Sequence, residues 1–121
     1  MAQQPLANYL RSYRKRSGLS QLELARLLGH DREGQISRHE RACNVPPLPA
    51  ALAYQAVFQV PIAELFPGLY RSIEREIETR LVAFELSLQE KDAKDSDGNA
   101  TAHKLEWCSE RRQAKEDALR R

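Results

Sequence analysis

The chain has 121 residues, of which 41% are hydrophobic, and its 19 basic and 17 acidic residues give a net charge of only +2. This length supports one small domain plus an appendage, and so modest a net charge identifies no class of partner. The first residues, Met-Ala-Gln-Gln-Pro, do not form a signal peptide, and no apolar run approaches the length of a membrane span.

The distribution of charge and of cysteine is more informative than the totals. Residues 1–68 carry eight basic and five acidic residues, whereas residues 69–121 carry eleven and twelve. The positive excess therefore lies in the first half of the chain. Cys43 and Cys108 are far apart in the sequence and match no metal-binding spacing. We expect two reduced thiols in a cytoplasmic protein, with no metal and no cofactor.

An amphipathic helix is predicted from Leu6 to about Ser17, because apolar residues recur there at positions i, i+4 and i+7. Gly18 ends it. The other face of this helix is basic and is either a solvated surface or an edge that contacts phosphates. Its basic residues are Arg11, Arg14, Lys15 and Arg16.

Two short helices joined by a turn are predicted between Leu19 and Ala42. Ser20 and Glu23 have the spacing of a capping box, which starts the first of these helices. A narrow apolar stripe follows, and Gly29 ends the helix. The stripe consists of Leu24, Ala25 and Leu28.

The second of the two helices has Ile36 as its single strong apolar anchor. Long or hydrogen-bonding side chains surround this anchor and are expected to face outward. They are Arg32, Glu33, Gln35, Ser37 and Arg38. A short polar helix held against a packed helix is how many proteins present side chains to the major groove of DNA.

A proline-containing loop follows from Asn44, and two further helices complete the predicted first domain, residues 1–68. One runs from Pro49 to about Phe58, and a short one lies within residues 60–66. The apolar contacts expected around the longer helix are Leu48, Leu52, Tyr54 and Phe58. Pro67 and Gly68 are expected to close this five-helix, all-α domain.

This half of the chain resembles the phage-repressor-like (Cro/repressor, or Xre-type) helix-turn-helix family. The resemblance spans Leu6 to Phe66. The residues that carry it are Arg14, Gly18 to Gln21, Leu24, Ala25, Leu28, Gly29, Ile36 to Arg38, Glu40, Arg41 and Val60 to Phe66.

The resemblance implies roles for particular residues. Arg14 would form an ion pair with Glu40 that braces the first helix against the third. Gln21, at a helix N-terminus, would contact a phosphate. Side chains around Ile36 would read bases, and this set comprises Glu33, Gly34, Gln35 and Arg38.

The chain also departs from the family pattern. Between Gly29 and Ile36 it has one residue more than usual, so either the turn is longer or the recognition helix starts later. Gly34 inside that helix would cost about 1 kcal/mol relative to Ala. His39 occupies a position that is usually apolar, and we expect it to be half-buried and hydrogen-bonded rather than a pH sensor. Ala42 replaces a usual Gly, so the helix is expected to end less sharply.

Beyond Gly68, a long amphipathic helix is predicted over residues 69–90, with one stripe of large apolar side chains. The stripe consists of Ile73, Ile77, Leu81, Phe84 and Leu88. It either packs back on its own domain or mediates self-association, and we favour self-association. Residues 91–121 are expected to be a polar linker and a charged, solvated helical tail, with the linker or helix break running from Gln89 to Ala102.

These patterns predict a sequence-specific DNA-binding transcriptional regulator that acts as a homodimer on double-stranded DNA. The alternative is a protein-interaction or antitoxin-like module with the same fold, which would bind a protein partner through the stripe Ile73–Leu88. The sequence shows no carboxylate pair, nucleophile motif, phosphate loop or Cys/His cluster. We therefore expect no enzymatic activity and no catalytic residues.

Overall fold

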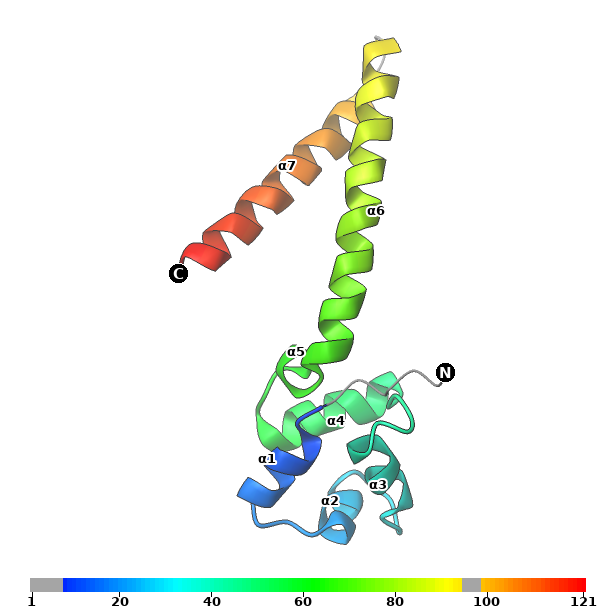
Figure 1. Cartoon of the computed structure of the whole chain (residues 1–121), viewed down its shortest axis with the longest axis vertical. Helices are drawn as coiled ribbons and strands as arrows, with labels where there is room; N and C mark the ends of the chain where they lie inside the picture. Colours follow the sequence, from blue (N-terminus) through cyan, green and yellow to red (C-terminus); the bar gives the residue numbers. More distant parts are fainter. Residues whose placement is uncertain (1–7, 95–98) are drawn as a thin grey trace, which may run out of the picture. The chain divides into compact units, whose positions relative to one another are not determined.

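A computed structural model describes residues 8–94 and 99–121 of the chain (Figure 1). Seven helices make up this part, and no strand occurs among these residues. The prediction of an all-α chain is therefore confirmed. The chain divides into two compact units between Ile73 and Glu74, rather than after Gly68 as the sequence suggested.

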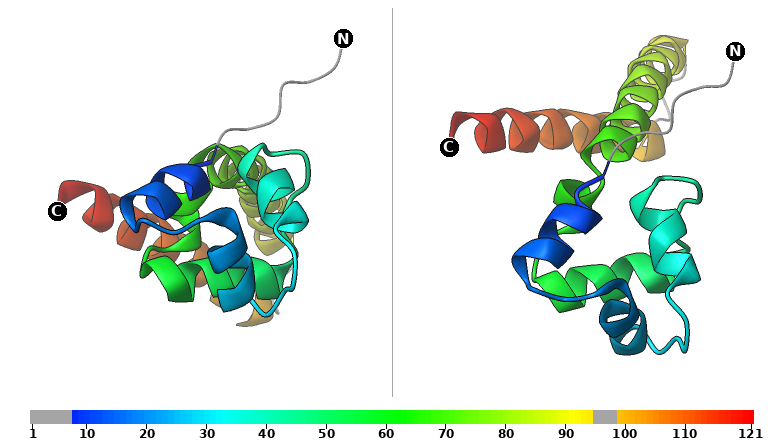
Figure 2. Two further views of the ribbon diagram at one scale, coloured as in Figure 1. Left: turned by 90° about the horizontal axis from the view of Figure 1, so that it is seen from below. Right: turned by 60° about the horizontal axis from the view of Figure 1, so that its bottom comes forward.

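Five short helices and the first residues of a sixth form the first unit. The five are α1 (Leu10–Arg16), α2 (Gln21–Leu27), α3 (Gly34–Glu40), α4 (Leu48–Phe58) and α5 (Ile62–Leu65). Helix α2 packs beside α3, α1 contacts both α3 and α4, and α4 contacts α5 (Figures 1 and 2). Every one of the five contributes to the core, whose buried side chains are Leu10, Leu24, Ala25, Ile36, Tyr54, Leu65 and Phe66.

Helix α1 begins at Leu10, and the predicted start at Leu6 lies outside the described residues. The side-chain Oδ1 of Asn8 accepts a hydrogen bond from the Leu10 N–H at 3.0 Å. The N–H of Tyr9 donates to the Leu65 carbonyl at 2.9 Å. These two bonds fix the entry of the chain into α1 and join it to the end of α5.

Helices α1, α2 and α3 all end in the same Schellman motif. The residue after each C-cap is left-handed, with φ of 74° at Gly18, 88° at Gly29 and 58° at Ala42. At α3, the Cys43 N–H donates to the Arg38 carbonyl at 2.9 Å, which is the bond that defines the motif. The expectation that α3 ends less sharply at Ala42 is therefore wrong. Alanine adopts the conformation that glycine adopts more easily, at a cost of about 1–2 kcal/mol.

Two of the apolar contacts expected for α4 are also wrong. Leu48 and Leu52 are 66% and 49% exposed, whereas Tyr54 is fully buried as expected. The buried side of α4 runs through Ala51 and Tyr54 to the partly buried Phe58, at steps of three and four residues. Leu52 lies off this side, and Leu48 lies in the first turn of the helix.

Helix α6 (Pro67–Lys94) begins at the Pro-Gly pair that was expected to close the domain. Proline suits the first turn of a helix, because the N–H that it lacks has no intrahelical partner there. The linker expected after Gln89 is helical up to Lys94, and helix α7 (Asn99–Arg120) follows. Residues 89–94 contain no Gly or Pro and are good helix formers, and we mistook their polarity for a linker. Of the rest of the expected linker, residues 95–98 lie outside the described residues, and residues 99–102 are helical as part of α7.

The second unit is a helical hairpin of α6 and α7 held largely by charged side chains. Glu78 on α6 accepts from Arg111 at 2.7 Å and lies 3.1 Å from the Lys115 amine, and Glu85 accepts from Arg112 at 2.6 Å. The hydrogen bond from Arg111, and then that from Lys115, lowers the pKa of Glu78. The tail is thus an ordered partner of α6.

This pairing divides the apolar stripe predicted on α6. Leu88 is buried and Leu81 is half-buried, whereas Ile77 and Phe84 are 41% and 42% exposed. The reason is the helical spacing: α7 covers the side of α6 that carries Glu78, Leu81, Glu85 and Leu88, and Ile77 and Phe84 lie beside it. Part of the stripe therefore remains uncovered within this unit.

Candidate nucleic-acid interface

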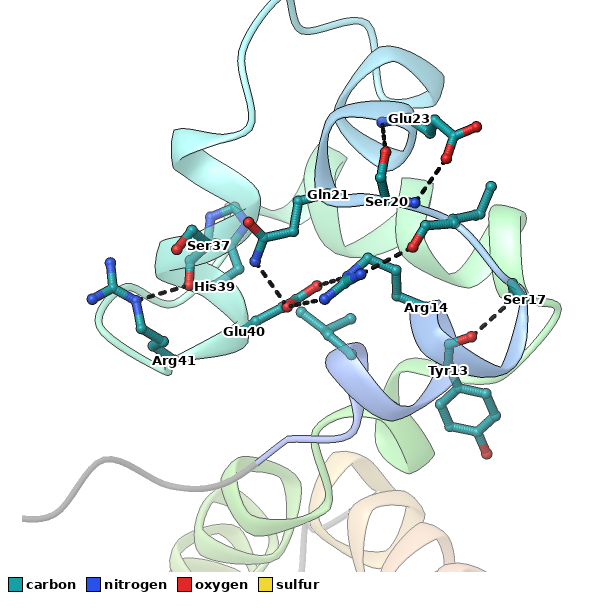
Figure 3. A network of polar contacts seen from close by, with 12 residues as sticks. Tyr13, Arg14, Ser17, Ser20, Gln21, Glu23, Ser37, His39, Glu40 and Arg41 are labelled. Carbon is teal, nitrogen blue, oxygen red and sulfur yellow. Dashed lines mark hydrogen bonds and ion pairs between the residues drawn. The ribbon is translucent and has the colours of Figure 1, made fainter.

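Helix α2 begins where the sequence predicts, and the residues at its N-terminus fix this start. The Ser20 hydroxyl accepts from the Glu23 N–H at 3.1 Å, and the Glu23 carboxylate accepts from the Ser20 N–H at 2.8 Å (Figure 3). The predicted capping box is therefore confirmed. Hydrogen bonding from Ser20, first from its backbone N–H and then from its side chain, lowers the pKa of the Glu23 carboxyl. Because this cap fixes where α2 starts, it also fixes Gln21 in the first helical position.

The extra residue between Gly29 and Ile36 left two alternatives, a longer turn or a later start of the next helix. The turn between α2 and α3 decides between them. The His30 N–H donates to the Ala25 carbonyl at 2.9 Å and completes the cap at Gly29. Helix α3 then begins only at Gly34, so this helix starts later than the usual pattern. Gly34 belongs to this helix as expected, but it is the first helical residue, so the penalty for an interior glycine does not apply. Arg32 and Glu33 precede the helix.

A buried ion pair connects the two ends of this region (Figure 3). Glu40, at the end of α3, accepts from the Arg14 Nε at 2.6 Å and from the Arg14 Nη2 at 3.1 Å. The Arg14 Nη1 donates to the Leu19 carbonyl at 2.9 Å, in the loop before α2. The side chains of Arg14 and Glu40 are only 11% and 3% exposed. The predicted pairing is therefore confirmed, and the hydrogen bond to Glu40 raises the pKa of Arg14.

Gln21 belongs to the same network. Its Nε2 donates to Glu40 Oε1 at 3.1 Å, so the amide joins the start of α2 to the end of α3. This bond uses one of the two amide hydrogens, and the other can still donate to a phosphate. The network thus locks α1, α2 and α3 into one rigid frame.

The inner side of α3 rests on a neutral hydrogen-bonded pair. The buried His39 Nδ1 lies 2.7 Å from the Tyr54 hydroxyl on α4, and the two rings meet edge to face. His39 is more buried than we expected, at 4% exposure, but it is hydrogen-bonded as predicted. Burial lowers the pKa of His39 and raises that of Tyr54, so both groups stay uncharged near neutral pH. Ile36, fully buried, is the second anchor of α3.

The outer side of α3 is exposed and polar. Gln35 and Arg38 are exposed, as are Arg32 and Glu33 in the preceding turn, and Ser37 is half-buried. These five predicted residues line one shallow concavity. The other residues that line it are Gln21, His30, Asp31 and Gly34.

Two predicted phosphate contacts lie elsewhere, on α1. Arg11 and Lys15 are exposed, but neither lines this concavity. Within the concavity, Arg32 and Arg38 are balanced by Asp31 and Glu33, so the basic excess of the first unit does not lie there.

The prediction from the sequence did not single out one basic residue next to α3, which does not line the concavity. Arg41 is exposed after the end of α3, and its Nε lies 3.4 Å from the Ser37 carbonyl (Figure 3). It follows Ser37 by four residues and therefore lies one turn further along the same side of the helix. That spacing is the signal that could have identified it.

No family model, no curated protein and no solved structure matches the chain. Among residues 8–94 and 99–121, no cluster of His, Cys, Asp and Glu has the arrangement of a metal site. In this same part of the chain, no helix is both long enough and apolar enough to cross a membrane.

Proposed function

We propose that the chain is a sequence-specific DNA-binding transcriptional regulator, and that its first unit is a repressor-like helix-turn-helix domain. One observation carries the proposal: α3 buries Ile36 and His39 and leaves Gln35 and Arg38 exposed beside them. The Arg14–Glu40 pair holds the helix to α1, so these exposed side chains have a fixed support. A supported helix with a polar outer side is what major-groove recognition requires.

Each exposed residue suits one kind of contact. Arg38 can donate two hydrogen bonds to guanine O6 and N7, and Gln35 can bind adenine in the same bidentate way. Arg32 or Glu33, before the helix, would contact a neighbouring base, and Ser37 either a base or the backbone. The residues proposed to hold the phosphates and set the register are Gln21, Arg11 and Lys15.

We further propose that the protein binds DNA as a homodimer. The support is the uncovered part of the apolar stripe, Ile77 and Phe84, which lie beside the side of α6 that α7 covers. Burying two such side chains against a second copy would be favourable by roughly 1.5–3 kcal/mol each at full burial. A dimer would carry two recognition helices to half-sites about one turn of DNA apart.

The charge balance of the concavity favours a second candidate function, a protein-interaction or antitoxin-like module. Arg32 and Arg38 face a surface that also carries Asp31 and Glu33, and such a mixed surface suits a protein partner as well as DNA. Salt dependence separates the two functions, because phosphate binding releases counterions and partner binding need not.

The test compares a base-reading residue with a phosphate-binding residue. Arg38→Ala should weaken binding to a preferred site by about 1–3 kcal/mol and change binding to unrelated duplexes little. Lys15→Ala should weaken binding to all duplexes and lower the slope of log affinity against log salt by about 0.9. Lys104→Ala, on exposed α7, is the control and should change neither quantity.

Fluorescence anisotropy with labelled duplexes at several salt concentrations measures both effects. If Arg38→Ala weakens binding to all duplexes equally, Arg38 contacts phosphate and its assignment as a base-reading residue is wrong. If affinity for every duplex is weak and independent of salt, the DNA-binding proposal itself fails.

A further inference from the structure

The side-chain amide of Asn8 makes two hydrogen bonds in different directions. Its Oδ1 accepts from the Leu10 N–H at 3.0 Å, and its Nδ2 donates to the His39 carbonyl at 2.8 Å. The first bond is local and closes an Asx-turn at the start of α1. The second bond crosses to α3, 31 residues further along the chain. Asn8 therefore joins the start of one helix to the end of another.

The acceptor of the second bond lies in the last turn of α3, where carbonyls have no partner within the helix. The Ala42 N–H donates to the His39 carbonyl at 3.1 Å as part of the cap, and Asn8 adds a donor from outside the helix. Arg38 directly precedes His39. The bond from Asn8 therefore holds the backbone of the turn that carries Arg38.

The Arg14–Glu40 pair holds the same turn of α3 from another point on α1. Arg14 lies one turn into α1, whereas Asn8 precedes the first helical residue. Their attachment points on α3, Glu40 and His39, are neighbours in the sequence. One attachment between two helices leaves a pivot, and a second attachment at the other end of α1 fixes the angle between them.

We propose that Asn8 is a positioning residue for α3, and that its bond to the His39 carbonyl sets the position from which Arg38 reads its base. This inference rests on the proposed DNA-binding function. Base-reading side chains have to be held within about 0.5 Å and 10–20° of their productive geometry. Asn8 does not line the concavity, so it acts only through α3.

Two substitutions keep the local bond and remove the one that crosses to α3. Asn8→Asp keeps the acceptor but has no N–H to donate, and Asn8→Ser keeps an acceptor on a side chain too short to reach His39 as well. Either variant should raise the unfolding equilibrium constant of the first unit about fivefold, because one neutral hydrogen bond is lost. Near-ultraviolet circular dichroism of tyrosine follows this unit, since all four tyrosines lie in it and the single Trp107 lies in the second unit.

Asn44→Asp and Asn44→Ser are the matched controls. Asn44 is exposed in a loop of the same unit, so these variants reproduce the change of charge and size without touching α1 or α3. The Asp control is needed because an added negative charge by itself weakens binding to phosphates.

Fluorescence anisotropy on the full chain compares a preferred duplex with a scrambled one, at a temperature where every variant is folded. Each Asn8 variant should lower the ratio of the two affinities at least about threefold relative to its Asn44 control, a part of what one bidentate base contact contributes. In an Arg38→Ala background the same change should lower the ratio much less. A residue that only stabilised the fold would leave the ratio unchanged.

Amide chemical shifts of the full chain give a second measurement that needs no DNA. Asn8→Ser should shift the amides of α3, and Asn44→Ser should leave them largely in place. Unchanged α3 shifts would refute the positioning role, as would an effect on the affinity ratio that persists in full in the Arg38→Ala background. If the wild-type chain discriminates between duplexes and both Asn8 variants discriminate equally well, the positioning role alone is refuted. If the wild-type chain binds all duplexes alike, the proposed function fails.

Discussion

Breaking the Arg14–Glu40 pair should destabilise the first unit far more than a surface ion pair would. The most informative changes are Glu40→Gln, which removes the charge but keeps the size, and Arg14→Met, which keeps the apolar stem. Glu40 accepts three hydrogen bonds, two from Arg14 and one from Gln21, so each single change leaves buried groups without a partner.

The structure sets the size of the effect. Removing one partner of a buried pair costs about 3–5 kcal/mol, and the 11% exposure of Arg14 places this pair at the lower end. A cost of about 3 kcal/mol lowers the melting temperature of a domain of this size by about 12–24 °C. The whole stability of such a unit is only about 3–10 kcal/mol, so a single change removes much of it.

Thermal melts followed by tyrosine circular dichroism measure the two single variants and the double variant. The double variant should be more stable than the sum of the single losses predicts, by at least about 1.5 kcal/mol, because it leaves no unpaired buried charge. Arg80→Met removes an exposed pair with Glu76 in the second unit, whose melting is followed through Trp107, and should cost that unit less than about 1 kcal/mol. Losses for Arg14→Met and Glu40→Gln that simply add would refute the coupling.

Three further predictions concern the cap at Ala42, the buried His39, and the exposed side chains Ile77 and Phe84. Ala42→Gly should stabilise the first unit by about 1 kcal/mol, since glycine adopts φ of 58° without strain, and Gly29→Ala should destabilise it by a similar amount; unchanged urea midpoints would contradict this. Burial lowers the pKa of His39 below the 6.5 of an unfolded imidazole, so its stability contribution should be complete above about pH 6.5 and be lost as the pH falls through the folded pKa. The urea midpoint should therefore fall with acidification more steeply than in His39→Gln, and parallel curves would argue against it. Changing Ile77 and Phe84 together to Asp should turn a dimer into a folded monomer in sedimentation, whereas a wild-type monomer at micromolar concentration would rule out this interface.

The sequence predicted the frame of the candidate site well, because local rules determine it. The Ser20–Glu23 capping box and the left-handed Gly29 depend on residues only a few positions apart, and both are present. The Arg14–Glu40 pair spans more of the chain, and only the family resemblance suggested it. The structure confirms this one contact, and membership of the family stays a proposal.

The sequence predicted the packing of α6 and α7 poorly, because that packing depends on a partner helix. The stripe on α6 was identified from its apolar residues alone, yet Glu78 and Glu85 lie on the side that α7 covers. Charged residues such as these can be recognised as part of a packed helix side only when it is known that basic residues of α7 lie across from them. Similarly, Leu48 and Leu52 could not be placed without knowing that Tyr54 reaches across to His39.

Selection of bound duplexes from a random-sequence DNA library tests the central claim most directly. We expect the full chain to enrich a two-fold related sequence with half-sites about one helical turn apart. Arg38→Ala should lose the preference at one guanine in each half-site while the remaining positions are kept. A library that stays random after repeated selection, or an enriched sequence that Arg38→Ala leaves unchanged, would contradict recognition of DNA by α3.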